Sequence, residues 1–166
     1  ANALQRPAVP SAANLWHRNH ILLLDDSLRR LTGTALLPRP NAGPAECSSV
    51  ATSDSLVLVS HGTGDDPIFN FATQAALDLW EMDWESFVST HSRLSAEQPE
   101  RHERQLFLEK VSKQGFVSDY TGIRISRTGK RFRITNALVW NVIEKDETLR
   151  GQAALFKISD VDYLVE

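Results

Sequence analysis

The sequence predicts an α+β domain: a five-stranded antiparallel sheet with helices on one face, preceded by an additional N-terminal helix. The order of segments carries this prediction. Two short segments rich in branched and aromatic residues precede several helical segments, and three longer strand-like segments follow them. The sequence RTGK between the first two long strands favours an antiparallel hairpin. We divide the chain into a leader with an amphipathic helix, a linker, the sheet domain and a tail, at residues 1–37, 38–54, 55–160 and 161–166.

The N-terminal helix is predicted from about Ser11 to Gly33, where glycine favours a helix end. One histidine and four apolar residues repeat there at intervals of three and four, and so share one face: His17, Ile21, Leu24, Leu28 and Leu31. Such a stripe needs a partner surface, either the sheet of the same chain or a second copy. We expect a homodimer, with the chain's own sheet as the alternative.

Three helices are predicted inside the domain. Asn70 or Thr73 is placed to cap the first, and Asp83 caps the second. The third begins near Pro99 and ends at Gly115. This third helix is highly charged and has only a narrow apolar face around Phe107 and Val111.

Composition argues against several classes of protein. The chain has 166 residues, of which 42% are hydrophobic and 23% charged, as in ordinary globular domains. A net charge of -3 and a pI near 6.0 argue against nucleic-acid binding. No apolar run approaches the roughly 20 residues of a membrane helix, and the N-terminal stretch has no long apolar centre typical of a secretory signal. We expect a cytoplasmic protein without a membrane partner.

Metal ligands and reactive thiols are scarce. The single cysteine, Cys47, excludes an internal disulfide and a cysteine-built metal site, and we expect an inert thiol in the linker. His17 and His20 have a usable ligand spacing, but no third ligand is visible nearby. We therefore expect no bound metal.

The polar stretch SHGTGDD at residues 60–66 has two interpretations. In one, His61 acts with Asp65 or Asp66 as the acid and base of a small-molecule enzyme. In the other, the glycines and aspartates form a turn. Ser60 and His61 are neighbours on a strand and so point to opposite faces, and no G-x-S-x-G motif is present. We favour the turn and expect no catalytic residue.

The long strand at 131–142 presents one predominantly apolar set of side chains that must face the core: Phe132, Ile134, Asn136, Leu138, Trp140 and Val142. Asn136 is the only polar member of that set. A buried amide is costly unless its hydrogen bonds are satisfied. Two alternatives follow: Asn136 bonds to protein in a closed core, or it faces a cavity that holds water or a ligand.

Several blocks of the chain, in this order, resemble the MEKHLA domain family, which is PAS-like. The blocks read HILLLDDSLRRLTGTALL, then VSHGTGDDPIFNFATQAALDLWEMDWESF, then SRLSAE, and then GIRISRTGKRFRITNALVWNV. The resemblance extends from about Trp16 to Phe156. It implies a PAS-like sensory or regulatory module without an assigned reaction. In the plant transcription factors that end in such a domain, the domain is associated with regulation of dimerisation. For a photosynthetic eukaryote, the plastid stroma becomes the alternative compartment.

The resemblance also implies where a ligand would bind, because PAS-like folds hold small molecules between the sheet and the helices. We expect a flat or apolar ligand in a cavity formed by the long strand, the last strand and helix 99–114. The predicted ligand-binding residues are Asn136, Trp140, Gln152, Phe107, Val111 and Phe132. Flavin-binding PAS photoreceptors use a reactive cysteine, whereas the corresponding region here reads STHSRLSAE, so no cysteinyl-flavin photochemistry is expected.

Overall fold

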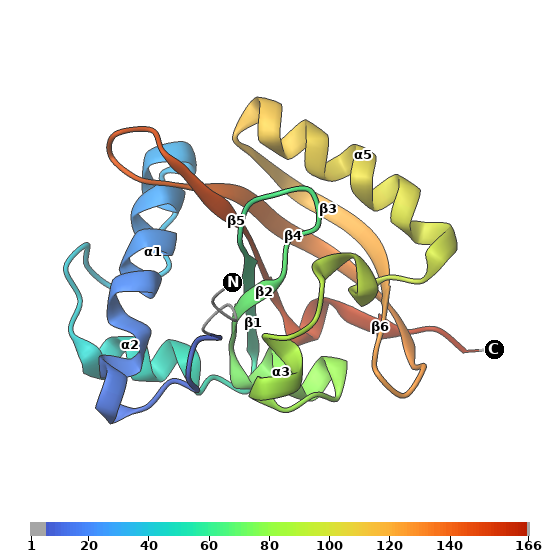
Figure 1. The fold of residues 1–166 in the computed structure, drawn as a ribbon, viewed down its shortest axis with the longest axis horizontal. Coiled ribbons are helices and arrows are strands. Elements are labelled where there is room, and N and C mark those ends of the chain that lie inside the picture. The colour runs from blue at the N-terminus through green and yellow to red at the C-terminus, as the bar shows by residue number, and fades with distance from the viewer. Residues whose placement is uncertain (1–5, 166) are drawn as a thin grey trace, which may run out of the picture.

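The computed structural model describes residues 6–165, apart from the side chains of residues 98 and 99. It contains a five-stranded antiparallel sheet in the order β2-β1-β5-β4-β3, with a short sixth strand, β6, paired to β4 (Figure 1). This confirms the predicted sheet. The strands are β1 (Leu56–His61), β2 (Phe69–Ala72), β3 (Phe116–Ile125), β4 (Arg131–Ile143), β5 (Leu149–Lys157) and β6 (Val161–Tyr163). The helices are η1 (Ala12–His17), α1 (Arg18–Thr32), α2 (Pro44–Ala51), α3 (Gln74–Trp80), α4 (Trp84–Phe87), η2 (Ser92–Ser95), α5 (Gln98–Gln114) and η3 (Ile158–Asp160).

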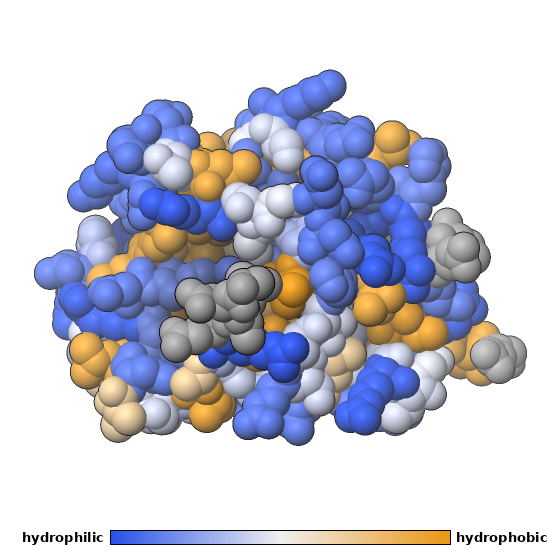
Figure 2. Space-filling model, viewed as in Figure 1, coloured by the Kyte–Doolittle hydropathy of each residue, from blue (hydrophilic) through white to orange (hydrophobic). Residues whose placement is uncertain are grey.

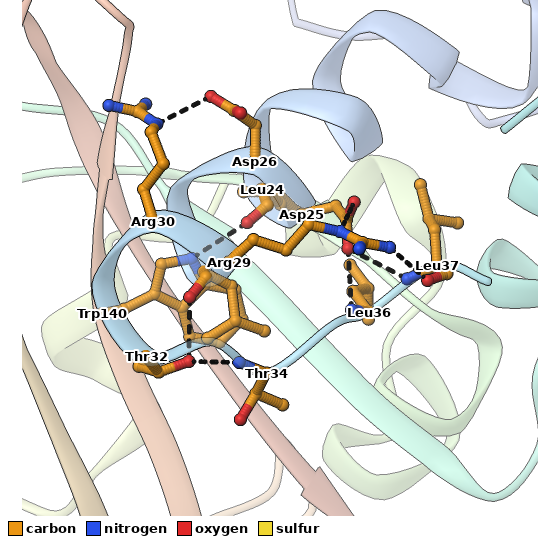
Figure 3. A network of polar contacts seen from close by, with 11 residues as sticks. Leu24, Asp25, Asp26, Arg29, Arg30, Thr32, Thr34, Leu36, Leu37 and Trp140 are labelled. Atoms are coloured by element: carbon orange, nitrogen blue, oxygen red, sulfur yellow. Dashed lines mark hydrogen bonds and ion pairs between the residues drawn. The ribbon is translucent and has the colours of Figure 1, made fainter. Parts of the chain in front are cut away.

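Helices cover both faces of the sheet. The pairing of β1, β4 and β5 sets His61, Asn141 and Gln152 side by side on the face that carries α3 and α5. The opposite face carries α1, where the indole N–H of Trp140 in β4 donates to the Leu24 carbonyl at 3.2 Å (Figure 3). Figure 1 shows α1 and α5 separated by the strands. The prediction of helices on one face therefore holds for the domain helices, and the N-terminal helix covers the other face.

The predicted stripe of α1 is buried against the sheet of its own chain. Ile21, Leu24 and Leu28 are completely buried, and α1 packs mainly on β4. His17 lies before the helix in a left-handed conformation, and its ring contacts the ring of Trp84 edge-on. Because the sheet covers the stripe, the stripe no longer argues for a second copy, and the homodimer stays a prediction.

The segment 38–54, for which the sequence predicts a linker, contains helix α2. Pro44 occupies its first turn, and the Glu46 carboxylate accepts the Gly43 N–H at 3.0 Å. Cys47 and Val50 are buried in the core. Eight small or polar residues show too little periodicity for α2 to be recognised, which explains the difference. The predicted tail likewise contains β6.

The predicted helix ends agree well with the structure. The Asp83 carboxylate accepts the Ser86 N–H at 2.8 Å and so caps α4. Gly115, with φ of 92°, ends α5. Thr73 occupies the N-cap position of α3, but its hydroxyl donates to the Leu56 carbonyl of β1 at 2.7 Å. None of the helices in residues 6–165 is long and apolar enough to cross a membrane.

Candidate functional site

A bulge in β4 decides which side chains face the helices. Between two of its pairings with β3, Gly122↔Ile134 and Tyr120↔Ala137, β4 uses one residue more than β3. Asn136 lies in this irregularity with φ of 54°. After the bulge the alternation of β4 is inverted, because Ile134 and Ala137 both line the same cavity although three positions separate them.

This inversion corrects the predictions for Asn136 and Trp140. Asn136 is exposed, and its amide donates to the Asp160 carboxylate at 3.2 Å. Trp140 is completely buried and lies against α1, on the face opposite α5. The prediction that both contribute to a cavity under α5 is therefore wrong. Its physical cause is the bulge, which a strict two-residue period cannot represent.

The four remaining predicted residues divide into two pairs. Phe107 and Gln152 line the cavity between α5 and the sheet. Phe132 and Val111 are completely buried but do not belong to its lining. Phe132 instead contacts the ring of Trp80 edge-on, with centroids 5.4 Å apart.

The buried amide expected in the long strand is Asn141, five residues after Asn136. Gln152 of β5 donates to the Asn141 side-chain oxygen at 3.1 Å and to the Ser112 hydroxyl of α5 at 3.2 Å. Asn141 donates in turn to the Val111 carbonyl of α5 at 3.3 Å. These contacts connect β4 and β5 to α5, and they satisfy both amide nitrogens inside the protein.

The cavity itself has a volume of about 70 Å³ and lies between α5 and the inward face of the sheet. Most of its wall is apolar and includes Phe69, Trp80, Phe107, Ile134, Val139 and Phe156. The ring of Phe107 stacks on that of Tyr120 with centroids 3.8 Å apart. Typical ligand pockets measure about 300–1,000 Å³, so this cavity admits only a molecule of a few non-hydrogen atoms unless side chains move.

A wider cleft of about 390 Å³ lies between the loop after β1 and α5. Four residues line both the cleft and the cavity and so separate the two spaces: His61, Arg104, Leu108 and Gln152. A molecule that enters from the cleft therefore meets the guanidinium of Arg104 and the imidazole of His61 before the apolar interior.

Arg104 is the most unusual of these side chains, since it is only 7% exposed and carries a charge. It donates to the Ser92 hydroxyl at 2.8 Å, and it forms no ion pair with a carboxylate of residues 6–165. Burial, together with the nearby cationic Arg124, lowers the pKa of Arg104 to about 10. The guanidinium therefore stays protonated at neutral pH. Its position in a strongly charged helix gives no hint of this burial.

Arg124 of β3 is a second buried cation at the cavity, but it has hydrogen-bond partners. It donates to the Tyr120 hydroxyl at 3.0 Å and to the Ile123 carbonyl at 2.8 Å. The Tyr120 hydroxyl donates to the exposed carboxylate of Glu103 at 3.3 Å, and burial raises the pKa of Tyr120. This chain of contacts brings a carboxylate close to Arg124, whereas Arg104 has no such connection among the described residues.

Ser60 and His61 point to opposite faces of the sheet, as predicted from their adjacency. The Ser60 hydroxyl donates to Asn70 at 2.5 Å and contacts Nε2 of His20 in α1 at 2.9 Å. His61 lines the cavity, and its Nδ1 lies 2.8 Å from the Gly62 carbonyl oxygen. Burial lowers the pKa of His61 to about 4, so its ring is neutral at pH 7.

The aspartates of the polar turn do not pair with His61. Asp66 binds Arg93 at 3.0 Å and His91 at 3.1 Å, which fixes the turn to the start of η2. Asp65 is exposed. No hydrogen bond joins His61 to either aspartate in the described part of the chain, so the geometry gives no acid–base pair there. No cluster of three or more His, Cys, Asp or Glu residues within residues 6–165 has the arrangement of a metal site.

Comparison with known proteins adds a family to this geometry. The family model described as the MEKHLA domain matches residues 18–160. Among curated proteins, the Homeobox-leucine zipper protein ATHB-14 of Arabidopsis thaliana is 28% identical over 104 residues, which cover 63% of this chain and 12% of that protein. The chain thus spans only a small part of the length of this relative.

Solved structures show the fold. The PAS domain of a protein from Colwellia psychrerythraea aligns with a TM-score of 0.56 and 11% identity, over 69% of this chain and 94% of that domain. An RNA-binding light-oxygen-voltage receptor aligns with a TM-score of 0.61 and 12% identity, over 76% of this chain and 36% of the receptor. At such low identity these similarities establish the PAS-like fold alone.

Proposed function

Because this chain belongs to the MEKHLA domain family, we propose that it is a PAS-like sensory or regulatory module that binds a small molecule between α5 and the sheet. One observation carries the proposal: the cavity under α5 shares lining residues with an outer cleft, and polar side chains lie at the boundary between the two spaces. Ligand sites in proteins have this combination of an apolar wall and a few placed polar groups.

The proposed ligand is small. A cavity of about 70 Å³ is well below the range for flat cofactors, and the stacked rings of Phe107 and Tyr120 occupy its wall. The single cysteine, Cys47, lies in α2 and outside the cavity lining, so it offers no side chain for a covalent adduct there. We therefore narrow the expected flat or apolar ligand to a molecule of a few non-hydrogen atoms.

The proposed response to the ligand passes through α5. This helix is joined to the sheet by the Asn141–Gln152 contacts, and only a narrow strip of its surface is buried. A ligand that contacts Arg104 and Phe107 changes the packing of α5 on the sheet, which other proteins can detect. Regulation of such a partner, or of a homodimer, is part of the proposal, and the oligomeric state is measurable by native mass spectrometry.

A structural interaction domain with a closed core is the second candidate. It is favoured by the satisfied hydrogen bonds of Asn141 and Gln152, which need no ligand. The two candidates differ in what the cavity contains, so a variant that fills the cavity separates them.

The test compares the masses of native and denatured protein. Ala137 is buried in the cavity wall, and Ala137→Val adds two carbon atoms to that wall. We expect wild-type protein to carry a small mass that denaturation releases, and Ala137→Val to lose it while remaining folded by circular dichroism. Ala42→Val, at a buried site outside the cavity lining, serves as the control and keeps the mass. Wild type without a bound mass, combined with an Ala137→Val variant of raised stability, supports the closed core instead.

A further inference from the structure

The cavity holds an excess of hydrogen-bond donors, of which Arg104 is the foremost. Arginine is rarely this deeply buried without a counter-charge, because an unpaired charge removed from water is costly. Its guanidinium carries five N–H groups, and one contact, to Ser92, is formed among the described residues. A second donor of the cavity lining, the indole N–H of Trp80, is buried and has no acceptor in residues 6–165. The Trp80 N–H thus lacks an acceptor among the described residues, and the Arg104 N–H groups that Ser92 does not use are free to bind one.

The other groups around Arg104 do not supply the missing negative charge. His61 faces it from β1 as a neutral ring, Gln152 from β5 as a neutral amide, and Arg124 from β3 as a second cation. Glu103 precedes Arg104 in α5 and acts on its charge from a distance, but its exposed carboxylate forms no ion pair with Arg104 in residues 6–165 and accepts the Tyr120 hydroxyl instead. No carboxylate of residues 6–165 therefore pairs directly with Arg104 inside the site.

We propose that the ligand is a small monocarboxylate whose carboxylate binds the Arg104 guanidinium and whose short apolar tail lies in the cavity. This inference rests on the function proposed above and names the chemical class of its ligand. A planar carboxylate accepts two parallel N–H groups from one guanidinium, which gives the pair both strength and orientation. The wall beyond Arg104, with Phe69, Ile134 and Val139, suits a hydrocarbon tail.

Size and charge both restrict the class. The cavity of about 70 Å³ is far below the roughly 300–1,000 Å³ of typical ligand pockets, so together with the entrance at Arg104 it admits a molecule of only a few non-hydrogen atoms. Arg124 already donates to the Tyr120 hydroxyl and to a backbone carbonyl, whereas among the described residues Arg104 donates to Ser92 alone, so Arg104 is the cation with N–H groups left for a ligand. One negative charge is therefore sufficient, and a dianion would place a second carboxylate against the apolar wall.

The experiment is a thermal-shift and calorimetric titration of the full chain with sodium butyrate. 1-Butanol has the same tail without the carboxylate, and sodium chloride at equal ionic strength controls for non-specific anion effects. We expect butyrate to raise the melting temperature in a saturable manner, and neither control to do so. Arg104→Met, which keeps much of the side-chain volume, should abolish the shift, and Arg104→Lys, which retains the charge without the planar fork, should weaken binding at least about tenfold.

Arg93→Gln is the matched control, because Arg93 lines the outer cleft only and is paired with Asp66. Its butyrate affinity should equal that of wild type. Equal responses to butyrate and 1-butanol, or to butyrate and chloride, overturn the carboxylate assignment without any variant, and undiminished butyrate binding by Arg104→Met overturns the role of Arg104. In those cases a mass released on denaturation still supports a ligand-binding module. Absence of both the butyrate response and the released mass contradicts the proposed function as well.

Discussion

Asp25 is expected to be the most costly charged side chain of α1 to remove. Its carboxylate is 1% exposed, accepts the backbone N–H groups of Leu36 and Leu37 at 2.7 and 3.0 Å, and binds Arg29 at 2.7 Å (Figure 3). Arg29 also donates to the Leu37 carbonyl at 2.6 Å. One carboxylate thus fixes the segment after α1 to the helix, and the buried stripe of α1 depends on that arrangement.

The size of the effect follows from the groups left behind. Asp25→Ala leaves two N–H groups without their acceptor at about 1–3 kcal/mol each, and it removes the counter-charge of Arg29. Allowing for partial access of water to Arg29, we expect a loss of about 3–5 kcal/mol in the free energy of unfolding, the range typical of breaking a buried pair. Asp25→Asn keeps an oxygen acceptor and should lose less.

The neighbouring Asp26 provides a matched control. It pairs with Arg30 at the same helical spacing and at 2.9 Å, but it is 37% exposed and accepts no backbone N–H group from residues 6–165 (Figure 3). Asp26→Ala should cost less than about 1 kcal/mol. Urea denaturation at pH 7 measures both values, with equal slopes expected because the surface exposed on unfolding is unchanged. If the two alanine variants lie within about 1 kcal/mol of each other, the argument from buried N–H groups is refuted.

Two further predictions concern acid stability and the bulge. Burial lowers the pKa values of His20 and His61 from 6.5 to about 4, and the nearby His17 contributes to the shift of His20. The stabilisation from the two neutral rings is therefore complete above pH 6.5 and is lost as the pH falls towards 4. We expect the free energy of unfolding to fall by about 1–2 kcal/mol for each half-buried ring, below the upper limit of roughly 3 kcal/mol for such a shift. Urea denaturation at pH 7 and at pH 4.5 measures this loss. In a variant that carries both His20→Gln and His61→Gln, the two urea midpoints should converge. Asn136→Val should lower the free energy of unfolding by about 1–2 kcal/mol, and Asn136→Gly by less than about 0.5 kcal/mol, because φ of 54° disfavours a β-branched residue. Equal losses in the two variants would argue against the bulge.

The sheet was predictable from sequence because its strands are separated by clear turn and helix signals. Caps and helix ends such as Asp83 and Gly115 are local features, and local features survive in any tertiary context. The face of each residue in β4 was predictable only up to Thr135, the residue before Asn136. Beyond it both faces are buried, by α1 and by α5, so apolar residues occupy successive positions and hydropathy no longer reports orientation.

The sequence left open which surface covers the apolar stripe of α1. Hydropathy gives the stripe of α1 but does not say whether the covering surface belongs to the same chain. The outer side of Trp140 and its neighbours in β4 provides that surface. Figure 2 shows the molecule from the same side as Figure 1, and there apolar residues form separate groups among hydrophilic ones.

The burial of Arg104 was not predicted, because the residues next to it in the sequence are also charged. It stands in the charged run PERHERQ, where a further arginine is unremarkable. Helical spacing nevertheless carries a signal: Arg104, Phe107, Leu108 and Val111 lie at positions i, i+3, i+4 and i+7, so extension of the apolar stripe by one turn places a cation on the buried face. A charge on the inner stripe of an otherwise solvated helix is costly without a partner. A buried arginine, like a buried amide, needs a group that accepts its hydrogen bonds. The cavity beside Arg104 is where such an acceptor fits.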